Sequence, residues 1–527
     1  MFFKLDSIAL LGIDCLKISI EIHISSGLPS FTVVGLPDKA VNESRMRVRA
    51  AIINSGFKFP LKRIIINLSH ADIKKEGPCY DFPIAFALLA ASSQVICSNT
   101  DLLNKCLFIG ELSLDGGLNP VRGIISMVEF ASYCRKEFFL IPEPNFSQAL
   151  IANRGTKEVI KIISCSNLKY ATGLIASRQV LLKKADEDCK MIKIKAASSA
   201  SKINTCSNYT DFNIIKGQLR AKRALEIAAA GMHNILLVGP PGAGKTLLAQ
   251  SIISILPELS EDESLEVTKI YSLLKNIKGD VITTRPFRNP HHTITSAGLS
   301  GGGAIPKPGE ISLAHRGVLF LDEFSQFPGV LIENLRQPLE NKEIIIVRNN
   351  YSYRFPASFM LILATNPCMC GYNGDKKKDC KCSHREVIKY WKKISGPIID
   401  RIDMRVNVER LEAKDFMDIN FSAENSCEIK IRVNTAHNIQ KERYLNALGN
   451  IHYNSEVNAE IVNRWESGNN GLSGLIPEMV KRFNFSARAI ASLIKVARTI
   501  ADLDGSKDII QEHFMESLNF RIDFAYE

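Results

Sequence analysis

The chain has 527 residues, of which 46% are hydrophobic and 23% are charged, and its formal net charge is +11 at pH 7. This composition is ordinary for a folded protein of two or three domains. A run of about 18 apolar residues and a signal-peptide pattern are both missing, so we expect a cytoplasmic protein with no membrane partner. The 13 cysteines are odd in number and mostly scattered, which argues against a disulfide framework. The positive charge favours a polyanionic partner.

The first predicted domain covers residues 1–176 and is rich in strands. Apolar side chains occupy every second position from Leu16 to Ile24, a period of two that predicts a strand. Helical runs follow, for example over residues 82–91. From 177 to 210 the sequence becomes polar and loses its periodicity, so we interpret this stretch as a linker.

Two further segments follow the predicted linker. Residues 211–410 form an α/β segment, and residues 411–527 form a helical segment. The clearest helix of the second segment has one apolar face, from which Arg498 and Asp502 are excluded. The predicted fold class of the whole chain is therefore α/β.

The strongest motif of the chain lies at the start of the α/β segment, where an apolar strand runs into a glycine-rich loop. The loop matches GxxxxGK[ST] in the strand–loop–helix context that this motif requires. Glycines allow the backbone to approach phosphates closely, the helix N-terminus favours anions, and the lysine is a mobile cation. The threonine hydroxyl is a ligand for Mg²⁺. The sequence therefore predicts ATP and Mg²⁺ bound by Gly239, Pro240, Pro241, Gly242, Ala243, Gly244, Lys245 and Thr246.

Two later strands end in polar residues that suit the same reaction. A strand that starts at Gly317 ends in Asp322, expected to hold Mg²⁺ directly or through water, and in Glu323, expected to polarise the attacking water. A third strand ends at Asn366, whose amide suits positioning that water. Taken alone, an asparagine before Pro367 is more often a turn residue.

Four cysteines within fifteen residues form a separate group: Cys368, Cys370, Cys380 and Cys382. Closely spaced thiols in a reducing compartment suit tetrahedral Zn²⁺, and nearby lysines favour thiolates. The CxC spacing is tighter than the usual CxxC, so unligated or redox-active thiols are an equal alternative.

The order of these motifs, followed by the block from Ser395 to Asp403, resembles a AAA+ ATPase of the helix-2-insert branch. That branch includes magnesium-chelatase I subunits and replicative helicases. The similarity to the ComM/YifB group of magnesium-chelatase-like proteins covers nearly the whole chain, including the blocks 285–292 and 301–315. This resemblance implies a homo-hexameric ATPase that acts on single-stranded or branched DNA and promotes branch migration during natural transformation or recombination. A magnesium-chelatase motor and a protein-remodelling ATPase are the alternatives.

The resemblance also implies roles for two arginines. Arg401 resembles the arginine finger that reaches the γ-phosphate bound by a neighbouring subunit. Arg488 resembles the sensor-2 arginine at the head of a helix in a C-terminal lid. A structural ion pair is the alternative for either residue.

Related rings carry inserts that project towards the central channel. Residues 280–310 fit this description, and their cations, among them Arg285, Arg288 and Lys307, could grip a phosphate backbone. We expect His291 and His292 to be hydrogen-bonding groups and not metal ligands. A second hairpin is predicted from Lys342 to Phe355. It either contacts DNA or is an ordinary hairpin with a solvated face, and the sequence favours neither interpretation.

The N-terminal segment resembles the Lon-protease catalytic domain, an α+β domain with a ribosomal-protein-like fold. The block from Lys75 to Cys79 corresponds to the nucleophile-bearing turn. The position of the protease's lysine base is occupied by Ile125. Because a nucleophile without a positioned base is poorly activated, we expect a non-proteolytic binding or assembly scaffold.

Overall fold

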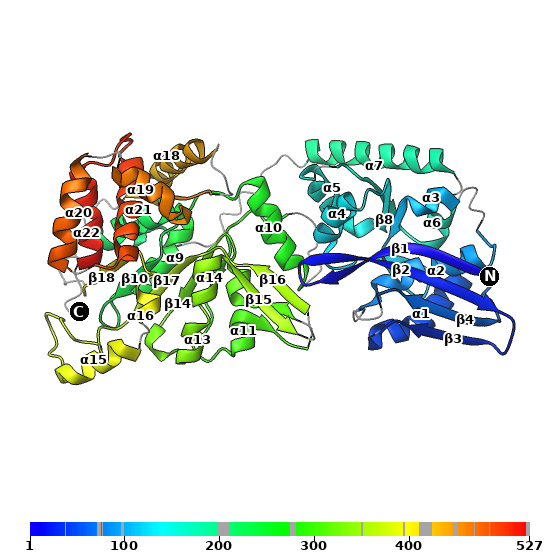
Figure 1. Ribbon diagram of the computed structural model, residues 1–527, viewed down its shortest axis with the longest axis horizontal. Helices are drawn as coiled ribbons and strands as arrows, with labels where there is room; N and C mark the ends of the chain where they lie inside the picture. Colours follow the sequence, from blue (N-terminus) through cyan, green and yellow to red (C-terminus); the bar gives the residue numbers. More distant parts are fainter. Residues whose placement is uncertain are drawn as a thin grey trace.

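The computed structural model (Figure 1) describes residues 1–36, 38–70, 75, 77–95, 100–156, 158–175, 177–198, 210–274, 281–304, 306–348, 351–393, 396–410, 424–445, 451–467, 470–483 and 485–522. The N-terminal domain, blue to cyan in Figure 1, lies beside a larger body that is green to red.

A four-stranded sheet opens the N-terminal domain, in the order β1-β2-β4-β3. Its strands are β1 (Phe2–Leu11), β2 (Asp14–Ser25), β3 (Ser30–Val34) and β4 (Arg63–Leu68). The period-two prediction is confirmed by β2, in which Ile18, Ile20, Ile22 and Ile24 are buried. Strands β1 and β2 are antiparallel, whereas β3 and β4 are parallel. The helices α1 (Lys39–Asn54) and α2 (Asp81–Ala91) contact each other, and α2 also contacts β1 and β2.

A second, parallel sheet completes this domain, in the order β5-β8-β9. Its strands are β5 (Cys106–Phe108), β8 (Phe138–Pro142) and β9 (Lys161–Cys165), and a short ladder joins β6 (Glu111–Leu112) to β7 (Leu118–Asn119). The helices of this part are α3 (Thr100–Asn104), α4 (Ile124–Tyr133), α5 (Phe146–Arg154) and α6 (Leu168–Leu174).

The first part of the predicted linker is helical, which differs from our expectation. Helix α7 spans Arg178–Ser198 and packs against β9. Leu181 and Ala185 are buried on one face, and Asp188 on the same face accepts a hydrogen bond from the Ser164 hydroxyl at 2.9 Å. Sequence analysis did not predict this helix because Asp188, a charged residue, occupies one of the positions on its buried face. Residues 199–209 of the predicted linker lie outside the described residues.

Five parallel strands form the sheet of the α/β segment, in the order β11-β14-β17-β10-β18. They are β10 (Ile235–Val238), β11 (Phe287–Arg288), β14 (Val318–Leu321), β17 (Met360–Thr365) and β18 (Met404–Asn407). Every residue of β10, β14 and β17 is buried, as is typical of parallel strands covered on both faces. The predicted α/β fold is therefore confirmed.

The helices of this segment are α8 (Leu219–Gly231), α9 (Lys245–Ile255), α10 (Glu261–Ser272), α11 (Ser296–Ser300), α12 (Glu310–Leu313), α13 (Gly329–Glu333), α14 (Arg336–Asn341), α15 (His384–Lys393) and α16 (Gly396–Ile399). The predicted second hairpin forms as the antiparallel pair β15 (Glu343–Arg348) and β16 (Tyr351–Pro356). In the predicted insert, β12 (Gly301–Gly302) pairs with β13 (Lys307–Pro308).

The C-terminal segment is helical, with α18 (Ser426–Tyr444), α19 (Ala459–Ser467), α20 (Asn470–Phe483), α21 (Ala487–Leu503) and α22 (Gln511–Ile522). The expectation that Arg498 and Asp502 lie off the buried face of α21 is wrong, because both are buried. Asp502 accepts hydrogen bonds from Arg498 at 3.1 Å and from Arg443 at 2.9 Å, which compensate the burial of its charge. Among the described helices, none has the length and apolar character needed to cross a bilayer.

We expect Asp502→Asn to lower the free energy of unfolding by about 3 kcal/mol, because it leaves the buried Arg498 and the half-buried Arg443 without their carboxylate. Urea unfolding of the full chain measures this effect. The exposed Asp508 provides the matched control, and Asp508→Asn should leave the unfolding midpoint where it is. Equal midpoints for the two variants would show that the buried carboxylate contributes little.

Among the described residues, the N-terminal domain contacts the α/β segment at α10 and at the β15–β16 hairpin. Helix α10 packs against α4, where Lys269 and Glu129 form an ion pair at 2.6 Å. The β1–β2 turn meets the hairpin, since a Cβ built on Gly12 would lie 3.4 Å from Cδ1 of Tyr353 and 3.5 Å from Cζ of Phe355. The two bodies of Figure 1 are thus joined through side-chain contacts as well as through the chain itself.

Candidate nucleotide-binding and catalytic site

The predicted site residues follow three neighbouring parallel strands. Strand β10 lies next to β17, and β17 lies next to β14, with Val238 opposite Thr365 and Leu321 opposite Leu363. Because the strands are parallel, their carboxyl ends meet at one edge of the sheet, where ligands bind in open α/β sheets. The loop after Val238 and the polar residues after β14 and β17 therefore converge.

The glycine-rich loop has a backbone that residues with a side chain rarely adopt. Gly242 and Gly244 have φ values of 77° and 88°, in the left-handed region. A Cβ built on Gly239 would lie 2.2 Å from the carbonyl oxygen of Val408. The loop leads directly into α9, whose N-terminal amides and dipole favour an anion at this position.

Lys245 is the buried cation of this loop. Its Nζ donates hydrogen bonds to the carbonyl oxygens of Gly239 at 2.7 Å and Pro240 at 3.0 Å, and to Oδ1 of Asn366 at 3.1 Å. Burial lowers the pKa of Lys245, while the nearby Asp322 and Glu323 act in the opposite direction. The structure therefore brings the predicted lysine and the predicted amide into direct contact.

The hydroxyl of Thr246 donates a hydrogen bond to Oδ2 of Asp322 at 2.7 Å. Oδ1 of the same carboxylate accepts a hydrogen bond from the backbone amide of Glu323 at 2.8 Å. Mg²⁺ prefers hard oxygen ligands at about 2.1 Å in octahedral geometry, so two adjacent ligands lie about 3 Å apart. The donor set and the spacing of Thr246 and Asp322 thus fit Mg²⁺.

Glu323 has an exposed side chain on an unusual backbone. Its φ of 48° lies in the left-handed region, which is uncommon for residues other than glycine. Oε2 of Glu323 lies 3.9 Å from Nδ1 of His292, a half-buried side chain whose ring lies 4.0 Å from that of His291. Sequence analysis missed His292 as a neighbour of this carboxylate, because no motif links the two residues.

Both predicted arginines contact one carboxylate in the chain itself. Arg401 and Arg488 each donate a hydrogen bond from Nη2 to Oε1 of Glu340 on α14, the second at 3.0 Å. These hydrogen bonds lower the pKa of Glu340. Sequence analysis missed Glu340, which belongs to no motif and lies 61 and 148 positions from the two arginines.

Two cations of the predicted insert have structural partners, which contradicts the expectation that they grip DNA. Arg285 is buried and donates hydrogen bonds to the carbonyl oxygens of Pro257 and Arg316, each at 2.6 Å, and to Glu263 at 2.9 Å. Arg288 forms a bidentate ion pair with Glu310 at 2.5 and 2.7 Å. Their guanidinium donors are used within the fold. The exposed cations of this region and of the hairpin are Lys307, Arg348 and Arg354.

The four predicted cysteines lie close together. The Sγ atoms of Cys368, Cys370, Cys380 and Cys382 all lie within 4.8 Å of one another. Among the described residues, these four thiols form a cluster of metal ligands that are close enough to hold one metal ion. It comes directly after Asn366 and Pro367 and therefore borders the nucleotide loop.

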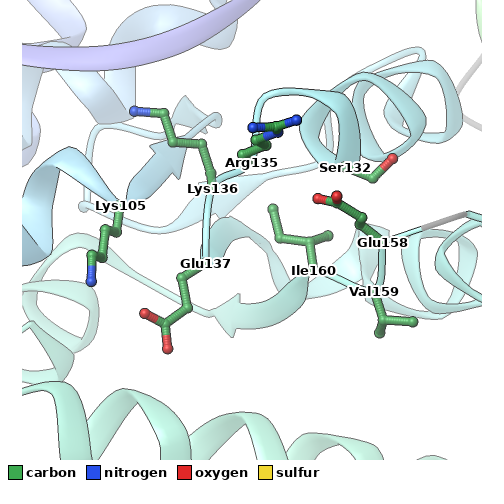
Figure 2. A pocket seen from close by; sticks show the side chains of 8 residues that line it. All are labelled: Lys105, Ser132, Arg135, Lys136, Glu137, Glu158, Val159 and Ile160. Carbon is green, nitrogen blue, oxygen red and sulfur yellow. The ribbon is translucent and has the colours of Figure 1, made fainter.

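The N-terminal domain buries the side chain at position 125. Ile125 is fully buried in α4, and Cys79 packs against the same apolar cluster. Burial raises the pKa of the Cys79 thiol to about 12, so it is a thiol and not a thiolate near neutral pH. A separate pocket of this domain, with a volume of about 340 Å³, is lined by charged residues such as Lys105 and Glu158 (Figure 2) and contains none of the predicted site residues.

Three family models match the chain. Residues 211–416 match the model described as magnesium chelatase, subunit ChlI. Residues 20–145 match subunit ChlI of Mg-chelatase, and residues 423–521 match magnesium chelatase, subunit ChlI C-terminal. The first match covers the α/β segment, the second lies in the N-terminal domain, and the third covers most of the helical segment.

Relatives that match nearly the whole chain show which family of magnesium-chelatase-like proteins it belongs to. Competence protein ComM of Haemophilus influenzae is 38% identical over 517 residues, which cover 97% of this chain and 96% of that protein. The chain belongs to the ComM/YifB family of magnesium-chelatase-like proteins. The uncharacterised protein YifB of Escherichia coli, of the same ComM/YifB family, is 37% identical over 518 residues, 97% of this chain and 96% of that protein.

A magnesium chelatase itself is a more distant relative of this ComM/YifB protein. The magnesium-chelatase 38 kDa subunit of Rhodobacter capsulatus is 25% identical over 174 residues, 30% of this chain and 50% of that protein. Membership in the ComM/YifB family makes the chain an AAA+ ATPase and implies the use of ATP and Mg²⁺.

Proposed function

We propose that the chain assembles as a homo-hexameric ring and acts as a DNA motor that promotes branch migration while DNA is integrated during natural transformation or recombination. The contact of Thr246 with Asp322 beside Lys245 carries the ATPase part of this proposal. The printed name of a relative, competence protein ComM, and the net charge of +11 support the DNA part. The partners would be single-stranded or branched DNA and other copies of the chain, in the cytoplasm.

Each residue of the site has a defined task in this proposal. Lys245 and the loop amides bind the phosphates, and Thr246 with Asp322 holds Mg²⁺, which neutralises phosphate charge when bound. Glu323 accepts the proton of the attacking water, and Asn366 orients that water. Arg401 reaches the nucleotide of the neighbouring subunit, and Arg488 relates the state of the nucleotide to a helical lid formed by residues 411–527.

ATP turnover with and without nucleic acid tests this function. We expect single-stranded or branched DNA to stimulate hydrolysis by the purified full chain, and ATP to drive branch migration where a non-hydrolysable analogue does not. A turnover rate that no DNA changes would count against a DNA motor. The descriptions of the matching family models favour a magnesium-chelatase motor as the second candidate, and such a motor would require partner subunits.

The exposed hairpin cation Arg354 is a candidate contact to the DNA backbone. We expect Arg354→Ala to weaken DNA binding for all sequences alike and to reduce the slope of log K against log salt by about 1, as loss of one phosphate contact does. Binding titrations at several salt concentrations measure the slope. Lys62→Ala removes an exposed charge of the same sign in the N-terminal domain and should leave the slope unchanged. An unchanged slope for Arg354→Ala would exclude this contact.

We also propose that residues 1–176 form a Lon-protease-like domain that lacks the catalytic base and serves as a scaffold. The buried Ile125 and the raised pKa of Cys79 support the loss of peptidase activity. The contact between α4 and α10 supports a role in which the domain is fixed to the ATPase segment.

A further inference from the structure

The four-cysteine group has the spacing of a metal site. Three of its sulfur pairs are 3.3, 3.6 and 3.6 Å apart, and all four Sγ atoms lie within 4.8 Å of one another. Tetrahedral zinc with Zn–S bonds of about 2.3 Å separates its sulfur ligands by about 3.8 Å. A disulfide would bring two sulfurs to about 2.05 Å. The thiols therefore already lie near the positions of four ligands around one ion.

The local chain favours a closed, structural site. Gly371 and Gly374 have φ values of 84° and 79°, which let the backbone turn back between the two CxC pairs. The amide of Gly371 donates a hydrogen bond to the carbonyl oxygen of Cys368 at 3.0 Å. Zinc with four thiolates carries a net charge of −2, and the segment from 368 to 382 carries more lysines, at 376, 377, 378 and 381, than acids, at 375 and 379.

We propose that Cys368, Cys370, Cys380 and Cys382 bind one Zn²⁺, and that the segment 368–382, here called the knuckle, braces the nucleotide loop when the metal is bound. The zinc site stands on the thiol geometry alone. The bracing role rests on the nucleotide binding described under the proposed function, although not on any activity towards DNA.

The knuckle touches the nucleotide loop directly. A Cβ built on Gly371 would lie 2.8 Å from Cδ of Pro241 and 3.8 Å from Cγ of Asn366, so the backbone at Gly371 packs closely against the Pro241 ring. Cys368 follows Asn366 by only two residues. A shift of the knuckle would therefore move both Pro241 in the loop and the amide that contacts Lys245.

A second connection runs through Arg410. Its guanidinium Nη2 donates a hydrogen bond to the carbonyl oxygen of Pro241 at 3.4 Å. The same guanidinium lies 5.8 Å from the ring centroid of Tyr372, and its Nη1 lies 3.9 Å from Oδ2 of Asp375. The knuckle thus holds a cation against the loop, and metal binding would order both contacts at once.

Metal analysis of the full chain tests the zinc site. We expect about one zinc ion per chain after purification from zinc-supplemented cells, and tetrahedral thiolate absorption bands after substitution with Co²⁺. Cys380→Ser and Cys382→Ser should lose the metal, whereas Cys427→Ser, at an exposed cysteine outside the group, should keep it. Zinc far below one ion per chain, bound iron with visible absorption, or oxidised thiols in these positions would overturn the zinc site.

Nucleotide binding tests the brace. We expect wild-type protein stripped of zinc by a chelator to bind a fluorescent ATP analogue about 10-fold more weakly, and zinc readdition to restore the affinity. Cys380→Ser should show the weaker affinity, and Cys427→Ser should not. Equal affinities of the stripped and reloaded wild type would overturn the brace. These measurements contain no DNA, so an ATPase that DNA does not stimulate would leave both results standing.

Discussion

Glu323→Gln is expected to lower the rate of ATP hydrolysis by about 10²- to 10⁴-fold, because the amide cannot accept the proton of the attacking water. ATP binding should persist, since Lys245, Thr246 and Asp322 retain their contacts. Steady-state turnover and equilibrium binding of a nucleotide analogue separate the two effects.

The control for this variant is Glu333→Gln. Glu333 is a partly exposed carboxylate on α13 that pairs with Arg336 at 3.5 Å. We expect its replacement to leave turnover unchanged, because a surface ion pair contributes little. If Glu323→Gln hydrolysed ATP at the wild-type rate, another group would have to be the base, and His292 at 3.9 Å would be the first to examine.

If the chain forms the proposed ring, Arg401→Ala is expected to lower hydrolysis by about 10³- to 10⁵-fold, the range observed for arginine fingers. The isolated chain holds Arg401 against Glu340 together with Arg488, so reaching a neighbouring nucleotide requires Arg401 to give up this contact. Arg178→Ala, which removes an exposed arginine paired with Glu137 at 2.6 Å, should have no such effect.

Mixed rings distinguish a finger acting between subunits from a structural ion pair. Arg401→Ala subunits and Glu323→Gln subunits are each expected to be nearly inactive alone. A mixture should regain part of the activity, because some interfaces then combine an intact Glu323 with an intact Arg401 from the neighbouring chain. A mixture as inactive as its components would show that Arg401 acts within its own subunit or only supports the fold.

The nucleotide loop and the strand ends were predictable from sequence for a physical reason. Close phosphate binding requires glycines, a lysine and a hydroxyl within one short contiguous stretch, and buried parallel strands are recognisable as apolar runs that stop at polar residues. Their meeting point follows from parallel pairing. Lys245, Thr246, Asp322 and Asn366 therefore lie together as the strand pattern predicts.

Contacts between distant side chains were not predictable in this way. Glu340 lies 61 positions from Arg401, and no local pattern marks it as a partner. Arg285 and Arg288 looked like DNA-binding cations because a sequence shows charge but not burial, and the structure uses them to satisfy Glu263, Glu310 and backbone carbonyl oxygens. Helix α7 was missed because a buried Asp188 interrupts its apolar face.

The seating of the β1–β2 turn on Tyr353 and Phe355, together with the packing of α4 on α10, bears on how the chain can be divided. A shortened chain beginning near residue 211 would expose α10 and the Tyr353 and Phe355 rings of the hairpin to water. Such newly wetted surface promotes self-association. The N-terminal body therefore acts as a cover for these rings, and its removal would change the surface of the ATPase segment as well as the length of the chain.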